Sequence, residues 1–391
     1  MPGEKPTEDP GHALAGDDGS ADQDRRPTRW PPGFADGRAN RRALLVLTAL
    51  RGITPRQMLE VADREGSASA CLAAVKAGRA GSAADREHAR ELDPAAIEAA
   101  VATCGARFAS HGSEAYPPQL ENLKDPPAGL FVRGLPLPRR DRTVAVVGAR
   151  NCSDLGRELA LTIGRDLAAA GMCTVSGAAR GIDAAAHEGS LEAGGDTVAV
   201  LGCGIDVGYP RGSRALIARI AEVGTLVSEY PPGVPPEPFR FPARNRIVAA
   251  LGTALVVVEG AQGSGSMISA EHALDLGRDV FAVPGAITNP LAYVPHALIR
   301  EGATLIRGVD DLMRDLKLDG GPGLPRRRLD LTLAEQATLD LVTEPVLPEN
   351  VGKGLGLSVP EVLPLLVSLE MKGLVRNVGG RFEPRLEARA G

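Results

Sequence analysis

Two arginines flank an asparagine in the segment Phe241-Pro-Ala-Arg-Asn-Arg-Ile-Val-Ala-Ala-Leu251. An apolar stretch, Ala254–Val258, comes next, followed by the small-residue loop Gly263-Ser-Gly-Ser-Met-Ile-Ser-Ala270. A guanidinium group can donate two parallel hydrogen bonds to a phosphate, and the free amides at the start of a helix also bind anions. These residue types at this spacing therefore predict a site for a phosphodiester or a nucleotide.

Arg244 and Arg246 lie two positions apart at the expected start of a helix, so their side chains point in different directions. We expect one of them to reach the ligand and the other to pack against an acid such as Glu229 or Glu259. Asn245 lies between the two arginines and can cap the helix or bond to a neighbouring loop. The segment thus predicts that one arginine contacts the ligand and that the other lies inside the protein.

Ser264, Gly265 and Ser266 offer hydroxyl groups and backbone amides at the start of the next expected helix. Such a turn suits an anion. The loop lacks the Gly-Lys-Ser/Thr ending of a P-loop, so the sequence does not support hydrolysis of a nucleoside triphosphate.

Two further turns carry an arginine where a short apolar stretch ends. In each turn a glycine lets the chain change direction tightly. The arginine would emerge at the carboxyl edge of a parallel sheet, where open α/β folds bind ligands. We predict that both turns contribute to the same site; they are Gly148 with Arg150 after Thr143–Val147, and Gly177 with Arg180 after Cys173–Ser176.

A third turn, Val200-Leu-Gly-Cys-Gly-Ile-Asp-Val-Gly-Tyr-Pro210, is similar to a dinucleotide-binding motif. The fit is poor, because the third glycine, Gly208, is displaced and Tyr-Pro follows where a helix should begin. We interpret Gly202 and Gly204 as parts of a sharp loop that lets the backbone approach a ligand or another loop closely.

Asp183 and His187 are one helical turn apart and could form an acid–base pair. No serine or cysteine nucleophile accompanies them by spacing, and Asp183 is equally well explained as an acid near the start of a helix. We therefore interpret His187 as structural.

Composition limits the class of protein. The net charge is −5, and residues 143–315 contain fourteen arginines, no lysine and nineteen acids, so any polyanion must be bound by a local cluster of arginines. The five cysteines show no C-x-x-C spacing, which favours reduced thiols and argues against a disulfide or a metal site. With no leader-like N-terminus and no apolar run of about 18 residues, we expect a cytoplasmic protein without a membrane partner.

From Thr143 onward, short apolar stretches alternate with helical segments, as in a doubly wound, Rossmann-like α/β sheet of parallel strands. A periodic helical region precedes it, with a helix-turn-helix or a SAM- or helix-hairpin-helix-like pattern. Three amphipathic segments and a hairpin around Gly379-Gly380 follow it, which is a winged-helix pattern.

The expected strands are Thr143–Val147, Cys173–Ser176, Thr197–Leu201, Thr225–Ser228, Ala254–Val258, Asp279–Val283 and Thr304–Ile306. The expected organisation is a disordered tail (1–39), a helical domain (40–115), a connector (116–142) that contains a strand-like Gly129–Gly134, the α/β domain (143–317), a linker (318–329) and a winged helix (330–391).

The turns described above recur, in order, in a known family. The chain resembles the DprA/Smf family of DNA-processing proteins over about residues 41–385. The motifs that carry the resemblance are VVGARNCSDLG, SGAARGIDAAAH, LGCGIDVGYP, SEYPPG, FPARNRIVAAL, SGSMISAEHAL, GRDVFAVPG and LIREGA.

The resemblance implies a homodimer that binds single-stranded DNA, protects incoming DNA and loads the RecA recombinase during DNA-mediated transformation. It implies no catalytic residue, no metal and no cofactor. A dimer surface is implied around His296, Ile299 and Leu305. The resemblance carries a DNA-binding role onto Arg150, Arg180, Arg244, Asn245 and Arg246. Together with the glycines and serines of the same turns, the predicted DNA-binding residues are Gly148, Arg150, Ser176, Gly177, Arg180, Gly202, Gly204, Arg244, Asn245, Arg246, Ser264, Gly265 and Ser266.

The chain departs from the family pattern in places. Ala149 and Ser269 stand where the family has serine and threonine, and the stretch 289–296 differs from the family's usual approach to LIREGA. The winged helix carries Lys353, Lys372, Arg376 and Arg381, too few to decide between contact with DNA and contact with protein.

A second hypothesis is an enzyme that binds nucleotides or cleaves their N-glycosidic bonds, as related Rossmann-like folds do. It would require Glu259 and Glu271 to face a ribose-sized pocket. Under the DNA-binding hypothesis, base stacking would matter only if the groove holds Tyr209, Tyr230, Phe239 or Phe241, because aromatic residues make up only 3% of the chain.

Overall fold

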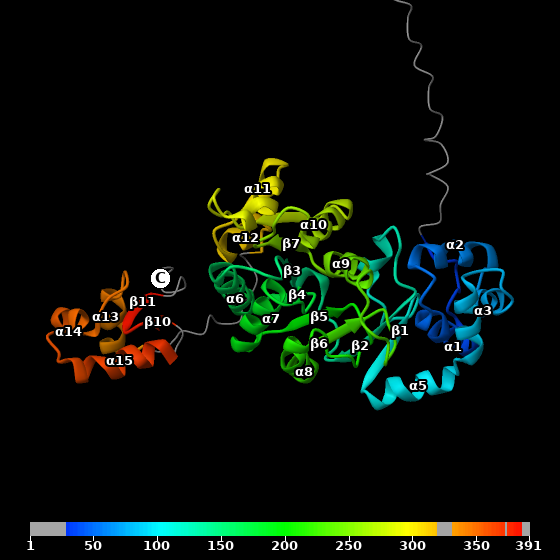
Figure 1. The fold of residues 1–391 in the computed structure, drawn as a ribbon, viewed down its shortest axis with the longest axis horizontal. Coiled ribbons are helices and arrows are strands. Elements are labelled where there is room, and N and C mark those ends of the chain that lie inside the picture. Colours follow the sequence, from blue (N-terminus) through cyan, green and yellow to red (C-terminus); the bar gives the residue numbers. More distant parts are fainter. Residues whose placement is uncertain (1–28, 319–330, 372–373, 385–391) are drawn as a thin grey trace, which may run out of the picture.

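The computed structural model describes residues 29–318, 331–371 and 374–384 (Figure 1). The predicted tail therefore lies mostly outside the described residues, as does the predicted linker. Residues 29–39 correct the prediction of a disordered tail: Trp30 and Phe34 are 4% and 1% exposed and their rings lie 4.7 Å apart. Aromatic burial of this extent fixes the chain ahead of the first helix.

Between residue 29 and the first strand, five α-helices are described. Side-chain caps begin several of them: Thr54 and Ser82 each complete a capping box, in which the cap and the third helical residue bond to each other's backbone amides. The helices are α1 (Gly37–Ala49), α2 (Pro55–Glu65), α3 (Ala68–Lys76), α4 (Ala83–Glu91) and α5 (Pro94–Thr103).

The described residues form a nine-stranded sheet in the order β1-β2-β6-β5-β4-β3-β7-β8-β9. The strands from β6 to β9 in that order are all parallel, which confirms the predicted doubly wound sheet. The strands are β1 (Ala106–Ser110), β2 (Gly129–Gly134), β3 (Thr143–Val147), β4 (Cys173–Ser176), β5 (Thr197–Leu201), β6 (Thr225–Ser228), β7 (Ala254–Val257), β8 (Asp279–Ala282) and β9 (Thr304–Leu305).

Strand β3 shows why these strands are apolar without alternation. Val144 and Val146 pack into a core on one face of the sheet, whereas Ala145 and Val147 pack into a second core on the other face. Helices cover both faces (Figure 1), so every side chain of the strand is buried. The helices of this domain are α6 (Asp154–Ala169), α7 (Ile182–Glu192), α8 (Arg214–Val223), α9 (Arg240–Leu251), α10 (Gly265–Asp275), α11 (Tyr293–Arg300) and α12 (Val309–Asp315).

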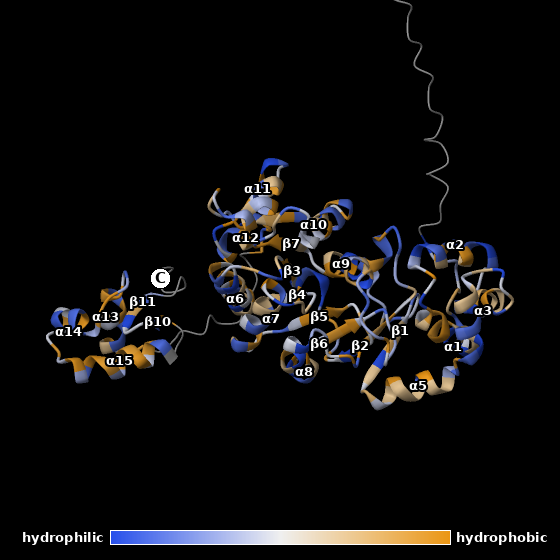
Figure 2. Ribbon diagram, in the orientation of Figure 1, coloured by the Kyte–Doolittle hydropathy of each residue, from blue (hydrophilic) through white to orange (hydrophobic). Residues whose placement is uncertain are grey.

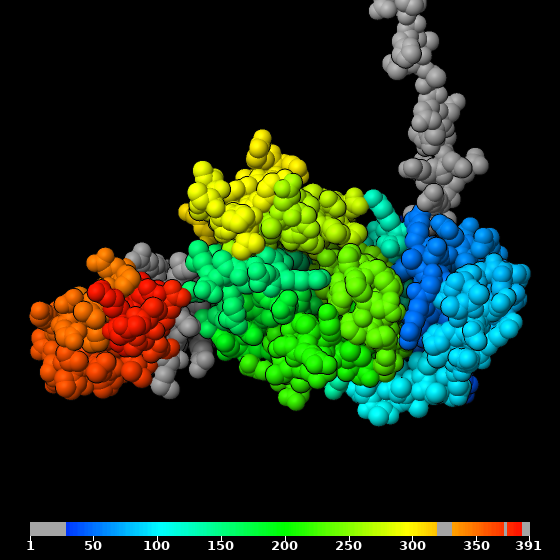
Figure 3. Space-filling model, in the orientation of Figure 1, coloured from blue at the N-terminus to red at the C-terminus, as the bar shows by residue number. Residues whose placement is uncertain are grey.

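The strand-like Gly129–Gly134 expected from the sequence is present as β2, but β1 and the place of both strands in the central sheet were not expected. The expected helical domain contains a strand, Ala106–Ser110, and the expected connector supplies its partner, Gly129–Gly134. Strand β1 pairs with β2 in antiparallel orientation, and β2 pairs with β6 in the same way. This part of the chain therefore extends the central sheet. The N-terminal helices share one apolar core with residues of β5, β6 and α8, and they lie directly against the central domain in Figure 3.

The C-terminal unit has a separate apolar core that includes Val342, Val351, Leu366 and Phe382. Its elements follow the predicted order of three helices and a hairpin, and the hairpin turns at Gly379 and Gly380, both with positive φ. The elements are α13 (Leu333–Leu341), α14 (Pro348–Leu355), α15 (Val359–Met371), β10 (Val375–Val378) and β11 (Arg381–Pro384).

Within the described residues, no single helix is both long enough and apolar enough to cross a membrane. One bent pair, Pro348–Leu355 with Val359–Glu370, meets the length and composition required for a span. Its two helices meet at 107° and their inner residues contribute to the C-terminal core.

Candidate nucleic-acid interface at the carboxyl edge

The order of the strands reverses direction beside β3. Strands β4, β5 and β6 follow on one side of β3, and β7, β8 and β9 lie on the other, so the direction of winding reverses between β3 and β7. Open α/β sheets bind ligands at the carboxyl ends of the strands at such a reversal. The turn with Gly148 and Arg150 leaves β3 at this point, and the loop with Ser264 leaves β7.

Arg150 is exposed at the reversal and lies over the ring of Phe241, with 5.4 Å between its guanidinium carbon and the ring centroid. Arg180, on the turn after β4, is also exposed. The two turns are in contact, because a Cβ atom on Gly181 would lie 2.3 Å from the carbonyl oxygen of Ala149. Gly181 also has a φ of +79°, so only glycine fits there without strain.

Arg244 lies under this surface and is 3% exposed. Its Nη1 donates to the carbonyl oxygens of Gly177 and Val200, and its Nε donates to Asn245 Oδ1 at 3.3 Å. Gly177 makes room for the guanidinium, since a Cβ atom there would lie 2.5 Å from it. Burial lowers the pKa of Arg244, and Arg150 lowers it further. The structure thus corrects the expectation that one arginine of the pair reaches a ligand directly.

Arg246 is 2% exposed and pairs with two acids. Its Nη2 lies 2.7 Å from Oε1 of Glu229 and its Nε lies 3.1 Å from Oδ2 of Asp125. These carboxylates outweigh the effect of burial and raise the pKa of Arg246. The prediction that one arginine packs against an acid is confirmed, with Glu229 as the acid, but Arg246 is corrected from a predicted DNA contact to an internal support.

Several other predicted site residues also lie inside. Ser176 is fully buried and donates to the carbonyl oxygen of Val146 at 2.6 Å. Ser266 is 4% exposed, and Gly202 and Gly204 are buried, with Gly202 against the ring of Phe241. These residues support the edge from below, and their burial leaves little surface for a ligand.

The loop after β7 is joined to the arginine segment by Asn245. Its Nδ2 donates to the carbonyl oxygen of Gly265 at 3.3 Å, as expected for a residue that bonds to a neighbouring loop. Ser264 accepts a hydrogen bond from the amide of Ser266 and begins α10. Gly265 is exposed, so part of the predicted anion-binding turn faces solvent.

Aromatic residues gather at the same edge, although they are scarce in the chain. The rings of Tyr209 and Phe241 stack with centroids 5.3 Å apart. Tyr209 and Phe239 are 42% and 53% exposed. The turn after β5 and the start of α9 therefore provide flat apolar surface beside Arg150.

Arg240 was not singled out from the sequence. It is 1% exposed, its guanidinium carbon lies 4.6 Å from the ring centroid of Tyr230 and 5.5 Å from that of Phe239, and it donates to the carbonyl oxygen of Pro235. This cation orients both rings. The signal available was its position between two phenylalanines in Phe239-Arg-Phe241.

The candidate acid–base residues are engaged elsewhere. Both carboxylate oxygens of Glu259 are bonded to Ser153, one by the backbone amide at 2.9 Å and the other by the hydroxyl at 2.6 Å. Glu271 is exposed on α10. His187 is fully buried and its Nδ1 lies 2.6 Å from the hydroxyl of Thr197, not from Asp183, which confirms a structural interpretation.

The residues of the predicted dimer surface lie on α11 and at the sheet edge. Leu305, on the outermost strand β9, is 45% exposed. Ile299 is half-buried against the core, and His296 Nε2 lies 3.0 Å from the carbonyl oxygen of Gly285. In the atypical stretch 289–296, Asn289 Oδ1 accepts a hydrogen bond from the amide of Leu291.

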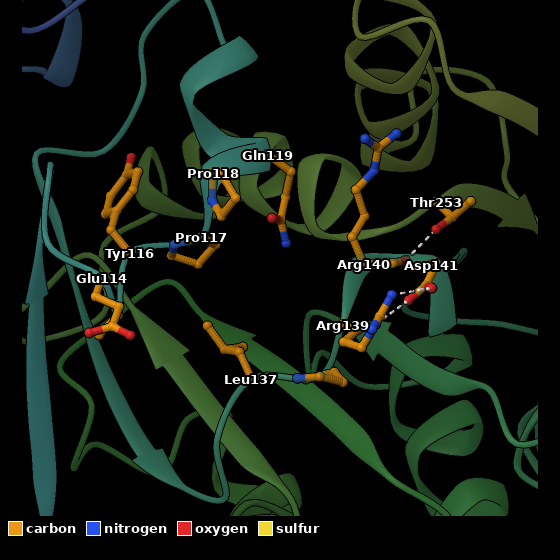
Figure 4. Close-up of a pocket in the computed structure, with 12 residues that line it drawn as sticks. Glu114, Tyr116, Pro117, Pro118, Gln119, Leu137, Arg139, Arg140, Asp141 and Thr253 are labelled. Atoms are coloured by element: carbon orange, nitrogen blue, oxygen red, sulfur yellow. Dashed lines mark hydrogen bonds and ion pairs between the residues drawn. The ribbon is translucent and has the colours of Figure 1, made fainter.

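A cavity of about 670 Å³ lies at the other end of the strands (Figure 4). Arg139 and Asp141 form an ion pair at its rim, and Thr253 donates to the carbonyl oxygen of Arg140. Because Thr253 precedes β7 and Asp141 precedes β3, this cavity is at the amino edge, away from Arg150. Its lining residues are Glu114, Ala115, Tyr116, Pro117, Pro118, Gln119, Leu137, Pro138, Arg139, Arg140, Asp141 and Thr253.

Comparison with known proteins gives consistent matches. The family model described as DNA recombination-mediator protein A matches residues 107–317. Protein Smf of Escherichia coli is 39% identical over 280 residues, covering 69% of this chain and 75% of that protein. DNA processing protein DprA of Bacillus subtilis is 38% identical over 205 residues, covering 52% and 69%. The X-ray structure of DNA processing protein A from Streptococcus pneumoniae aligns with a TM-score of 0.60 at 33% identity, covering 71% of this chain and 98% of that one.

Proposed function

The chain belongs to the DNA recombination-mediator protein A family, and on that premise we propose that it binds single-stranded DNA along the carboxyl edge of the central sheet. We further propose that it protects incoming DNA and delivers it to the RecA recombinase during transformation. The name of its relative in Bacillus subtilis, which describes processing of DNA, supports the general assignment.

The observation that carries the DNA-binding proposal is the exposed pair of cations at the winding reversal. Arg150 and Arg180 lie on turns that touch each other, and neither takes part in an ion pair within the described residues. Because residues 143–315 are acidic overall, two free guanidinium groups at one edge concentrate positive charge where the fold binds ligands. A backbone of successive phosphates is a matching ligand.

The aromatic surface beside Arg150 favours single strands over duplex. Unstacked bases offer flat faces that can lie against Tyr209 or Phe239, whereas the bases of a duplex are already stacked on each other. Stacking on exposed rings is tolerant of sequence. The proposed binding is therefore independent of sequence, with phosphates on the arginines and bases on the rings.

The buried cations give the edge its rigidity under this proposal. Arg244 ties the turn after β4 to the end of β5 through two carbonyl oxygens, and Arg246 is held by Glu229 and Asp125. Side chains locked in this way keep the exposed arginines in place before DNA arrives, which reduces the entropic cost of binding.

Titration of the full chain with a thymidine oligonucleotide, single-stranded and as a duplex with its complement, tests the proposal. We expect tighter binding of the single strand, and a logarithm of the affinity that falls linearly with the logarithm of salt concentration. Equal affinity for both forms, or an affinity independent of salt, would contradict it. Incubation with nucleoside monophosphates should release no free base.

The partner assignments are proposals with tests of their own. A homodimer through α11 and β9 predicts that Leu305→Glu shifts the sedimenting species from dimer to monomer, because a charge would be buried at the interface of two copies. Delivery to RecA predicts that the protein accelerates assembly of RecA on a strand coated with single-strand-binding protein. An unchanged sedimentation coefficient or an unchanged assembly rate would refute the respective assignment.

A further inference from the structure

Helix α15 of the C-terminal unit is apolar on two opposite faces. Its inner face carries Val362, Leu366 and Leu369, each 0% exposed and part of the unit's core. Its outer face carries four exposed residues at the spacing i, i+3, i+4 and i+7, which places them in one stripe. These residues, called here the outer stripe, are Pro360, Leu363, Pro364 and Val367.

The exposure of the outer stripe is unusual for this protein. Leu363 and Val367 are 39% and 44% exposed, and Figure 2 shows the hydrophobic colouring running along α15. A helix that is apolar all round is normally covered on all sides. Of the sixteen large apolar side chains exposed among the described residues, seven belong to the C-terminal unit, although it is a small part of the chain. Such a concentration marks an interaction surface.

DNA does not match the outer stripe. No lysine or arginine lies between residues 359 and 371, so the third helix, which would enter a groove in a DNA-reading winged helix, offers nothing to a phosphate. The described part of the unit has seven carboxylates and three cations. One of the three, Arg376, is paired with Glu383 and Glu158.

A second copy of α15 does not match either. The helix has Glu361 in its first turn and Glu370 near its end, one at each end of the outer stripe. Two such helices packed parallel would bring each glutamate close to its equivalent, and packed antiparallel would bring Glu361 close to Glu370. Like charges would therefore meet in both arrangements.

The complementary surface is apolar with positive charges at both ends. We propose that the outer stripe of α15 docks an amphipathic helix of a partner protein, whose own apolar stripe is flanked by lysine or arginine residues. The apolar stripes provide the buried area, and Glu361 and Glu370 select a basic partner and its register. This surface is distinct from the carboxyl edge proposed to bind DNA.

A synthetic peptide of about 15 residues, near the length at which an isolated helix becomes marginally stable, is a direct probe. It carries leucines at i, i+3, i+4 and i+7 with lysines flanking the stripe, and a matched peptide carries glutamates in place of the lysines. Binding to the full chain is followed by fluorescence anisotropy. We expect the lysine peptide to bind at least about tenfold more tightly than the glutamate peptide.

The variants compare two exposed leucines in the same unit. Leu363→Gln should weaken binding of the lysine peptide about tenfold, since it removes the centre of the stripe. Leu333→Gln, at a side chain 92% exposed on α13, makes the same chemical change outside the stripe and should leave binding unchanged. Circular dichroism of both variants verifies that the unit remains folded, and Val367→Gln provides a second variant of the stripe.

Several results would overturn the proposal. Equal affinity of the lysine and glutamate peptides would indicate non-specific hydrophobic binding. Equal binding of the lysine peptide by the wild type, Leu363→Gln and Val367→Gln would show that the outer stripe is not the binding surface. A duplex oligonucleotide that binds more weakly to Leu363→Gln would assign the helix to DNA. Weaker self-association of the same variant, seen by sedimentation, would assign it to a second copy of this chain.

Discussion

The carboxyl edge of the central sheet and the outer stripe of α15 are both exposed surfaces, but their compositions differ in opposite directions. The edge presents free cations, Arg150 and Arg180, within a domain that is acidic overall. The outer stripe presents Leu363 and Val367 within an acidic unit and has no cation of its own. The first surface suits a polyanion and the second suits an apolar, basic partner.

In this protein the location of charged side chains matters more for ligand choice than the total charge does. A net charge of −5 would argue against nucleic acid if charge were spread evenly. At the carboxyl edge, however, the acids Glu229 and Asp125 are turned inward onto Arg246. The outward-facing arginines form no ion pair within the described residues, although the buried carboxylate of Asp183 interacts electrostatically with Arg150. On α15, Glu361 is exposed, Glu370 is half-buried and accepts a hydrogen bond from the amide of Asn377, and residues 359–371 contain no cation.

The largest expected effect concerns the buried ion pairs beneath the carboxyl edge. Replacing Arg246 with alanine leaves Glu229 and Asp125 without their cation and should lower the free energy of unfolding by roughly 3–5 kcal/mol. Urea unfolding followed by the fluorescence of the single tryptophan, Trp30, measures the change. Arg211→Ala, at an exposed position, is the control, and a decrease below about 1 kcal/mol for Arg246→Ala would contradict the account.

A second test uses pH to distinguish the two regions. Burial, together with the nearby charge of Arg244, lowers the pKa of His187 from 6.5 to about 3, whereas residues 331–391 contain no histidine. Between these pH values the unfolded chain binds a proton that the folded domain does not. This contribution is therefore complete above pH 6.5 and decreases as the pH falls, by about 1.4 kcal/mol per pH unit.

His187→Gln should remove that dependence. Unfolding free energies at several pH values from 7 to about 4, again followed through Trp30, should give a slope smaller than that of the wild type by close to one proton. Trp30 is a suitable reporter because it shares an apolar core with Leu191 and Leu201, close to His187 in the fold. Identical slopes for the two proteins would show that His187 titrates normally.

A smaller change in DNA affinity should distinguish base stacking from phosphate binding at the carboxyl edge. Tyr209→Ala should weaken binding of single-stranded DNA by about 1 kcal/mol, or roughly fivefold, because one base no longer has a ring to stack on. The slope of affinity against salt should stay the same, since the arginines that bind phosphate are unchanged. Tyr293→Ala, at another exposed tyrosine, is the matched control; equal weakening in both variants would argue against a stacking site.

Much of the fold could be predicted because apolar runs, glycine turns and helix starts are local features. Strands β3 to β6 match their predicted bounds, and β7 to β9 end one residue earlier than expected. Strand β1 was missed because Ala106–Ser110 lies beside a long helical pattern and its pairing with β2 depends on distant residues. Trp30 and Phe34 were missed because a tail rich in proline and glycine conceals two isolated aromatic residues.

The location of the candidate site was predicted from the sequence, but the burial of several of its residues was not. Arg244 and Arg246 were recognised as a pair, yet sequence alone does not show that carbonyl oxygens at the ends of other strands receive Arg244. Asp125 joins Arg246 from far along the chain and could not be inferred from spacing. The outer stripe of α15 was missed for the same reason, because the exposed face of a helix is known only after its core is identified.

The salt dependence of single-stranded DNA binding, compared among the wild type, the double variant Arg150→Ala with Arg180→Ala, and Leu363→Gln, tests whether the exposed arginines of the carboxyl edge hold the DNA. We expect the double variant to bind at least about tenfold more weakly, with a slope of log affinity against log salt reduced by about 0.7 for each phosphate that the variant no longer neutralises. We expect Leu363→Gln to match the wild type. An unchanged slope in the double variant, or comparable weakening in Leu363→Gln, would contradict the account.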